Sequence, residues 1–127
     1  MAGTLGVGVI GCGNISSAYF RLSKLFQAIE VKACADLNME IAQAQAKEFG
    51  LEALSVEALL SHSEVDIIVN LTVPNAHFEV SKAILEAGKH VYSEKPLTLS
   101  LEDGLALRDL AQQRGLRVAC TPDTFLG

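Results

Sequence analysis

The sequence predicts an α/β protein with a doubly wound parallel sheet of six strands and helices on both faces. Short apolar runs alternate with segments whose apolar residues recur at helical spacing, which is typical of βαβ units. The run at 65–73 is almost continuously apolar, as expected of a central strand covered on both faces. A glycine follows three of the helical segments, where a left-handed residue commonly ends a helix. These glycines are Gly50, Gly88 and Gly115.

The first half of the chain contains three expected strands and three expected helices. Each strand is a short apolar run, and each helix is indicated by apolar periodicity or by a capping residue. In order, they are a strand at 5–10, a helix whose apolar face runs from Ile15 to Phe26, a strand at 31–36, a helix that Asn38 caps and Gly50 ends, a brief strand near Ala53, and a short helix that Ser55 caps.

The second half repeats the alternation. Proline and glycine mark the ends of its elements, because proline disfavours strand and helix continuation and glycine adopts the left-handed region. In order, the expected elements are a strand at 65–73 that Pro74 ends, a helix closed by Gly88, a strand at 90–93, a helix that Ser100 opens and that reaches Arg114, and a strand at 116–120.

Composition limits the function classes. The chain has 127 residues, enough for one domain, and half of them are hydrophobic, so a core can be buried. The net charge of -5 and the lack of a basic run argue against nucleic acid as the main partner, because phosphate backbones require clustered lysine and arginine. We recognise no secretory leader in the sequence. No apolar run approaches the roughly 20 residues that a membrane span requires. We expect a cytoplasmic protein without membrane contact.

The cysteines indicate neither a disulfide framework nor a metal site. Cys12, Cys34 and Cys120 are odd in number and widely spaced, and no Cys-x-x-Cys occurs. We expect reduced, mostly buried thiols and no bound metal.

A glycine-rich turn follows the first expected strand. It reads Gly11-Cys12-Gly13-Asn14-Ile15-Ser16, a G-x-G-x-x-S pattern with serine in the third glycine place. The glycines would permit a tight turn and close backbone approach to a pyrophosphate, whose charge the N-terminus of the next helix would stabilise. The alternative is an ordinary strand-to-helix turn that binds no ligand.

An acidic residue, Asp36, follows the second expected strand. In dinucleotide-binding sheets a carboxylate here accepts hydrogen bonds from the adenosine ribose. A 2′-phosphate would be repelled, so the sequence favours NAD over NADP. Alternatively, Asp36 assists capping of the following helix.

Polar residues also follow the strands at 65–73 and 90–93. Asn75 is a natural N-cap and can be that alone, and His77, in the first turn of a helix, is by default a surface residue. Lys95 precedes Pro96, which holds it extended. Near a nicotinamide, its ammonium could bind a substrate oxygen and help to move a proton. Otherwise Glu94 and Lys95 form a surface pair of little consequence.

The chain resembles the N-terminal domain of the Gfo/Idh/MocA oxidoreductase family, and the resemblance covers nearly all of it. The most specific element of the resemblance is the Glu-Lys-Pro motif, together with its distance along the sequence from the glycine-rich turn. The matching segments are GVIGCGNI at 8–15, CAD at 34–36, NLTVPNAH at 70–77, AGKHV at 87–91 and EKPL at 94–97.

The resemblance implies a Rossmann fold and a role for each motif residue. It also implies a cis peptide bond before Pro96. Pyrophosphate contacts would come from Gly11, Gly13, Asn14 and Ile15, the adenosine ribose contact from Asp36, the lining of the nicotinamide half from Thr72, Pro74, Asn75 and His77, the nicotinamide ribose contact from Glu94, and the catalytic contact with substrate from Lys95.

The resemblance further implies a longer parent protein. Residues 1–120 would form the dinucleotide-binding domain, and residues 121–127 would begin the crossover into a substrate-binding domain, with the role of Asp123 open. The parent would be an NAD(P)-dependent oxidoreductase and homo-oligomer acting on a hydroxyl-bearing carbon of a small sugar or cyclitol. The 127-residue chain alone would be inactive. A non-catalytic NAD-sensing or scaffold protein and an S-adenosylmethionine-binding domain are the alternatives.

Overall fold

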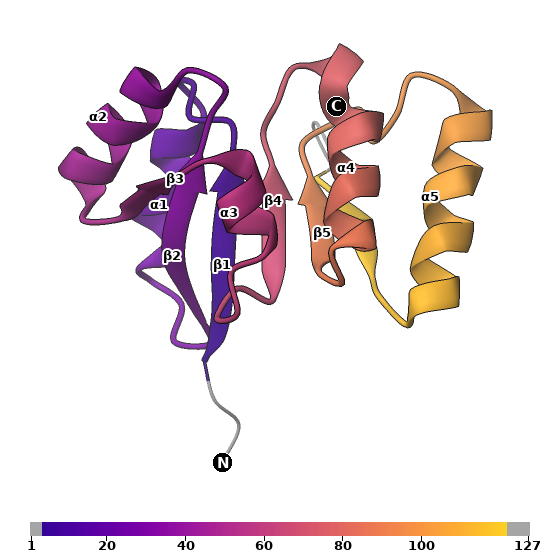
Figure 1. The fold of residues 1–127 in the computed structure, drawn as a ribbon, viewed down its shortest axis with the longest axis horizontal. Helices are drawn as coiled ribbons and strands as arrows, with labels where there is room; N and C mark the ends of the chain where they lie inside the picture. Colours follow the sequence, from indigo (N-terminus) through magenta and orange to yellow (C-terminus); the bar gives the residue numbers. More distant parts are fainter. Residues whose placement is uncertain (1–3, 122–127) are drawn as a thin grey trace.

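Six parallel strands form one sheet in the order β3-β2-β1-β4-β5-β6 (Figure 1). The computed structural model describes residues 4–121. The strand order reverses between β1 and β4, and open α/β sheets bind ligands beside this point, outside the carboxyl ends of the strands. The strands are β1 (Leu5–Ile10), β2 (Ile29–Ala35), β3 (Glu52–Leu54), β4 (Ile67–Asn70), β5 (His90–Ser93) and β6 (Val118–Cys120).

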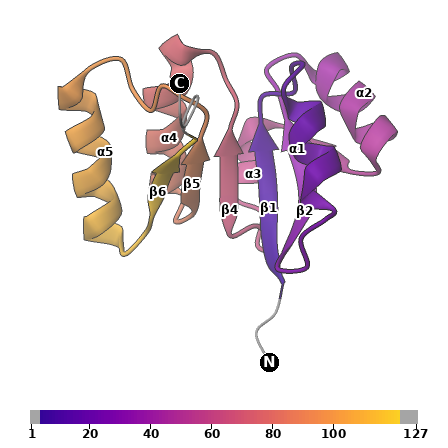
Figure 2. The same ribbon diagram turned by 180° about the vertical axis from the view of Figure 1, so that it is seen from behind.

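Helices cover both faces of the sheet, as Figures 1 and 2 show from opposite sides. One core cluster joins the sheet to α1 and α2, and the other joins it to α3, α4 and α5. Among the described residues, no helix is long and apolar enough to cross a membrane. The helices are α1 (Ser16–Ser23), α2 (Met39–Phe49), α3 (Val56–Leu60), the 3-10 turn η1 (Pro74–Ala76), α4 (His77–Glu86) and α5 (Leu101–Arg114).

Side chains alternate between the two cores, as the pleat requires. On β1, Val7 and Val9 face the cluster of α1 and α2, whereas Ile10 belongs to the cluster of α4 and α5. On β4, Ile68 is fully buried against the second cluster. The predicted fold class is therefore confirmed, with both faces of the central strands covered.

Three of the four expected helix caps are confirmed. The side chains of Asn38, Ser55 and Ser100 accept hydrogen bonds from Glu40 N, Ala58 N and Asp103 N. The expectation for Asn75 is wrong. This residue lies inside η1, and no side chain caps either η1 or α4.

The first helix is shorter than predicted. It ends at Ser23, and the chain then turns through i→i−3 hydrogen bonds from Leu25 N to Leu22 O and from Phe26 N to Ser23 O. Leu25 and Phe26 are 75% and 61% exposed. The helix ends before the apolar period does, because the chain must turn at this point to enter β2.

The strand expected at 65–73 is also shorter, since β4 covers only Ile67–Asn70. Val65 lies in a turn, where its backbone N–H donates a hydrogen bond to His62 O. Thr72 N donates to the Asn70 side chain instead of to a neighbouring strand. The expected strands at 31–36 and 116–120 likewise shift to Ile29–Ala35 and Val118–Cys120.

Candidate functional site

The residues predicted for the site follow four different strands and meet at one edge of the sheet. Gly11 follows β1, Asp36 follows β2, Thr72 follows β4 and Glu94 follows β5. These strands are parallel and hydrogen-bonded side by side, so their carboxyl ends share one border. Open α/β sheets bind ligands at this border, beside the point where the strand order reverses.

Gly11 makes the turn that brings the chain over this border. Its φ is +102°, a conformation that other residues rarely adopt. A Cβ here would lie 2.6 Å from Leu71 O and 3.0 Å from Thr72 N. Only glycine therefore allows the turn after β1 to lie against the loop after β4.

Gly13 leaves the outer side of the turn open. A Cβ built on it would meet no atom within 4 Å, and no side chain caps the helix that follows. Ser16 N and Ala18 N donate to Gly13 O and Ile15 O, whereas no contact among the described residues occupies the amides at 13–15. These turn amides suit a bridging pyrophosphate. Asn14 and Ile15 are both exposed beside this open side.

Ser16, in the third glycine place, is fully buried. Its hydroxyl donates to Gly13 O at 2.6 Å and accepts from Gln45 Nε2 at 2.8 Å. The small side chain allows close packing of helix on strand, and Gln45 of α2 fixes the turn from outside. The sequence motif did not indicate Gln45, because it lies 29 residues further along the chain.

Asp36 both fixes the glycine turn and caps the chain before α2. Its Oδ2 accepts a hydrogen bond from Cys12 N, and its Oδ1 accepts one from Asn38 N, each at 2.8 Å. A carboxylate has about four acceptor positions, so lone pairs remain for ribose hydroxyls. The capping alternative is therefore observed, and it leaves room for a ligand.

His77 is buried, so the alternative of an ordinary surface residue is wrong. It is 1% exposed, with Nε2 2.7 Å from Thr72 O and Nδ1 2.5 Å from Pro96 O. The ring thus joins the loop after β4 to the segment after β5. Polar groups that are this deeply buried need partners, and a carbonyl oxygen lies beside each ring nitrogen, so the ring N–H can donate to one of them.

Asn70, at the end of β4, completes this internal network. Its Nδ2 donates to His77 O at 3.1 Å and to Ser81 Oγ at 2.9 Å. Its Oδ1 accepts from Thr72 N at 3.2 Å and from Thr72 Oγ1 at 2.6 Å. The network holds Thr72 at the carboxyl edge of the sheet. Pro74 and Asn75 lie beyond it, in η1, and are exposed.

Glu94 and Lys95 lie on the same border. Glu94 N bonds to Asn70 O at 3.0 Å, so the segment follows β4 beyond the end of β5. The Glu94 carboxylate accepts hydrogen bonds from Tyr19 Oη at 3.1 Å and from Lys95 N at 3.2 Å. Lys95 is exposed, and its peptide bond to Pro96 is cis, as expected.

Besides Gln45, three contributors escaped prediction because nothing in their local sequence distinguishes them. Tyr19 reads as one more apolar-face residue of a helix, and Asn70 and Ser81 read as a strand end and a helix residue. Each acts on a segment distant in sequence. A polar residue within a continuous apolar strand, as at Asn70, is the signal that could have drawn attention.

The arrangement suits a dinucleotide better than a metal. Backbone amides, an open glycine and a carboxylate with free lone pairs lie in series along the border, as a pyrophosphate and a ribose require. Within residues 4–121, no cluster of three histidine, cysteine or acidic side chains could hold a metal ion. Cys12 and Cys34 are free and buried, and Cys120 is half-buried and free.

Comparisons with known proteins agree with this geometry. Residues 5–121 match the family model described as oxidoreductase family, NAD-binding Rossmann fold. The chain is 40% identical over 120 residues to a dTDP-3,4-didehydro-2,6-dideoxy-alpha-D-glucose 3-reductase of Streptomyces violaceoruber, covering 91% of this chain and 34% of the relative. It is 30% identical over 119 residues to an inositol 2-dehydrogenase of Salmonella paratyphi B, covering 91% and 35%.

A solved structure shows the same fold. The 3-ketoreductase KijD10 of Actinomadura kijaniata, in complex with NADP and TDP-benzene, matches with a TM-score of 0.89 and 31% identity. The match covers 94% of this chain and 37% of KijD10. The chain thus spans about a third of the length of the relatives it matches.

Proposed function

The chain belongs to the Gfo/Idh/MocA oxidoreductase family as its NAD-binding Rossmann domain, and from this premise we propose that its parent protein transfers a hydride between nicotinamide and a hydroxyl-bearing carbon of a sugar or cyclitol. The convergence of the glycine turn, Asp36 and the Glu94-Lys95 segment on one border supports the proposal most strongly. The named relatives act on a deoxysugar nucleotide and on inositol.

The cofactor would lie along the border from β2 to β5. Gly11, Gly13, Asn14 and Ile15 would hold its pyrophosphate, Asp36 the adenosine ribose, and Glu94 the nicotinamide ribose. Thr72, Pro74 and Asn75 would line the nicotinamide half. His77 would act from beneath, since its ring is enclosed by the carbonyls of Thr72 and Pro96.

Lys95 would be the catalytic residue of this domain. The bound cofactor supplies the hydride chemistry, and the protein supplies orientation and a path for the proton. The exposed ammonium would bind the substrate oxygen and hold its proton. A substrate-binding domain in the remainder of the parent would supply the other substrate contacts, so residues 1–120 would bind cofactor without turnover. The crossover proposed at 121–127 falls outside the described residues after Thr121, and Asp123 with it.

NAD is the proposed cofactor in preference to NADP. Asp36 places a carboxylate where a 2′-phosphate would lie, and Leu37 and Asn38 after it offer no positive charge. The related KijD10 was solved with NADP. We therefore expect this chain to differ from it at the adenosine ribose.

Calorimetry on the 127-residue chain tests the cofactor assignment. We expect saturable binding of NADH, weaker binding of NADPH and no binding of S-adenosylmethionine. Binding of S-adenosylmethionine without any NADH signal would replace the proposal with a methyltransferase-type domain.

Turnover in the full-length parent tests the catalytic assignment. Lys95→Ala should lower the rate of NAD reduction with polyols at least a hundredfold, while NADH affinity changes less than about threefold. An unchanged rate would remove Lys95 from catalysis. Failure of the wild-type parent to reduce NAD with any polyol or sugar would favour a sensing or scaffold role.

A further inference from the structure

A chain of hydrogen bonds joins the two halves of the sheet at its carboxyl edge. Tyr19, on the helix that follows the glycine turn, donates to Glu94 Oε1 at 3.1 Å across 75 residues of sequence. Thr121 Oγ1 lies 3.2 Å from the same tyrosine hydroxyl. The other oxygen, Glu94 Oε2, accepts from Lys95 N at 3.2 Å. Both oxygens of the carboxylate are thereby fixed, one by α1 and the other by the backbone that follows Glu94.

The Tyr19 hydroxyl is the donor in this chain. It has one proton, and when this proton goes to Glu94, the Thr121 hydroxyl can donate to the tyrosine oxygen. Burial and, to a smaller extent, the negative charge of Glu94 raise the pKa of Tyr19, against a lowering by Thr121. The phenol therefore stays protonated at neutral pH and can donate to a carboxylate.

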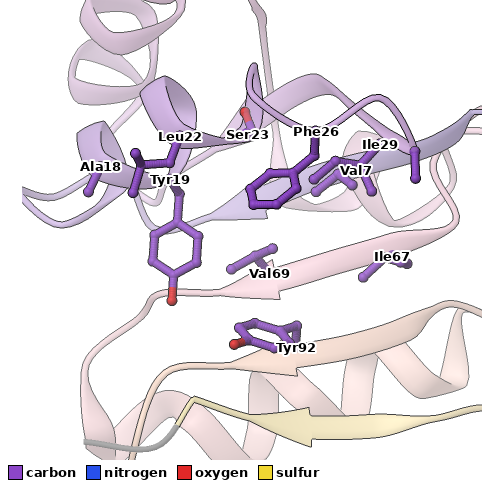
Figure 3. Close-up of a pocket in the computed structure, with 11 residues that line it drawn as sticks. Val7, Ala18, Tyr19, Leu22, Ser23, Phe26, Ile29, Ile67, Val69 and Tyr92 are labelled. Atoms are coloured by element: carbon purple, nitrogen blue, oxygen red, sulfur yellow. The ribbon is translucent and has the colours of Figure 1, made fainter. Parts of the chain in front are cut away.

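The ring of Tyr19 lines an apolar groove, whose volume is about 530 Å³. Figure 3 shows the ring extending from α1 at one end of this groove, with its hydroxyl oxygen pointing away from the helix. Val69, Leu22 and Tyr92 line the groove with it. The apolar part of the side chain thus borders the groove, and the hydroxyl lies at the polar border, where it bonds to Glu94.

The fixed carboxylate retains capacity for a ligand. It has about four acceptor positions, of which the bonds from Tyr19 and from Lys95 N use two. Two remain, one on each oxygen, and a ribose presents two adjacent hydroxyl donors. We propose that Tyr19 is a positioning residue that orients the Glu94 carboxylate toward the ribose hydroxyls of the nicotinamide half. This inference rests on the proposed function, because it requires a bound dinucleotide.

Tyr19→Phe is the direct test, since it removes the hydroxyl and keeps the ring in its groove. Binding of three probes to the 127-residue chain is measured by calorimetry: NADH, ADP-ribose and ADP. NADH and ADP-ribose contain the second ribose, whereas ADP does not. We expect the variant to bind NADH and ADP-ribose about fivefold more weakly and ADP unchanged.

Tyr92→Phe is the matched control, because it deletes a hydroxyl from the same groove without removing a bond to Glu94. It should leave all three affinities unchanged. Glu94→Ala completes a double-mutant cycle. If Tyr19 acts through Glu94, then adding Tyr19→Phe to Glu94→Ala should cause no further loss of NADH affinity.

The outcomes separate this inference from the proposed function. Equal NADH affinity in wild type and Tyr19→Phe would overturn the inference and leave dinucleotide binding intact. An equal loss for ADP would also overturn it, because the effect would then lie at the pyrophosphate or in the fold. A wild-type chain that binds none of the probes would overturn both.

Discussion

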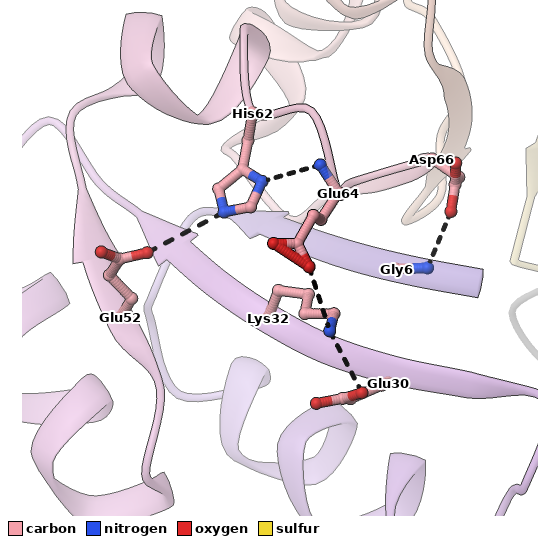
Figure 4. Close-up of polar contacts among 7 residues, drawn as sticks. All are labelled: Gly6, Glu30, Lys32, Glu52, His62, Glu64 and Asp66. Carbon is pink, nitrogen blue, oxygen red and sulfur yellow. Dashed lines mark hydrogen bonds and ion pairs between the residues drawn. The ribbon is translucent and has the colours of Figure 1, made fainter. Parts of the chain in front are cut away.

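The amino and carboxyl edges of the same sheet both gather charged side chains, but they use them differently. At the amino edge these groups mainly pair with one another, as Figure 4 shows. Lys32 Nζ lies 3.2 Å from Glu30 and 3.8 Å from Glu64, and His62 Nε2 lies 3.9 Å from Glu52. Exposed pairs of this kind contribute little to stability.

At the carboxyl edge the carboxylates instead accept backbone amides. Asp36 accepts from Cys12 N and Asn38 N, and Glu94 accepts from Lys95 N and the Tyr19 hydroxyl. These bonds fix the orientation of each carboxylate without neutralising it. The comparison teaches that the proposed binding edge differs from the structural edge in what holds its carboxylates: backbone amides and a hydroxyl at one edge, neighbouring cations at the other.

The largest expected effect is on stability and lies at the amino edge. In Gly6→Ala the new Cβ would lie 1.7 Å from Glu64 O, a backbone atom that cannot move aside cheaply. Overpacking of this kind should lower the free energy of unfolding by about 3 kcal/mol. Urea unfolding measures it. The affinity of the remaining folded protein for NADH should be unchanged, and a loss of affinity would mean that the two edges are coupled.

At the carboxyl edge, Gly13→Ala should show the reverse pattern. The new Cβ meets no atom within 4 Å, so urea unfolding should match wild type within about 0.5 kcal/mol. The methyl group would occupy the space through which a pyrophosphate approaches, and NADH affinity should fall at least tenfold. If calorimetry shows that Gly13→Ala binds NADH as tightly as wild type, the cofactor lies elsewhere.

Two aspartates offer a matched pair across the edges, since each accepts a backbone amide at 2.8 Å: Cys12 N for Asp36 and Gly6 N for Asp66. Both alanine variants should lose about 1–2 kcal/mol of stability. Only Asp36→Ala should also weaken the binding of NADH, by about tenfold, and narrow the preference for NADH over NADPH. An unchanged NADH to NADPH ratio would remove Asp36 from the ribose.

The smallest effect is a pH dependence of stability from Tyr19. Its pKa is raised in the folded state above the ordinary value of 10.0, chiefly by burial. The folded state therefore holds the phenol proton more tightly, and this contribution to stability is present below pH 10 and lost as the pH rises through the folded pKa. Relative to wild type, Tyr19→Phe should lose less stability above pH 10. Parallel pH profiles in urea unfolding would contradict this.

Local signals in the sequence sufficed for most of the fold. Capping at Asn38, Ser55 and Ser100 was predictable because a side chain there bonds to an amide two or three residues away. The end of α1 at Ser23 was not predictable, since the apolar period continues into a turn. Likewise, nothing near His77 distinguished a buried ring from a surface one.

The sequence by itself determined the alternation of strands and helices, the glycine turn and the border on which the motif residues gather. These follow from periodicity, capping and the parallel order of the strands, all of which act over short stretches or repeat along the chain. Only the tertiary structure decided which polar groups meet. The bonds from Tyr19 to Glu94 and from Gly6 to Asp66 join residues 75 and 60 positions apart. Such pairings depend on the packing of whole elements, and no local pattern encodes them.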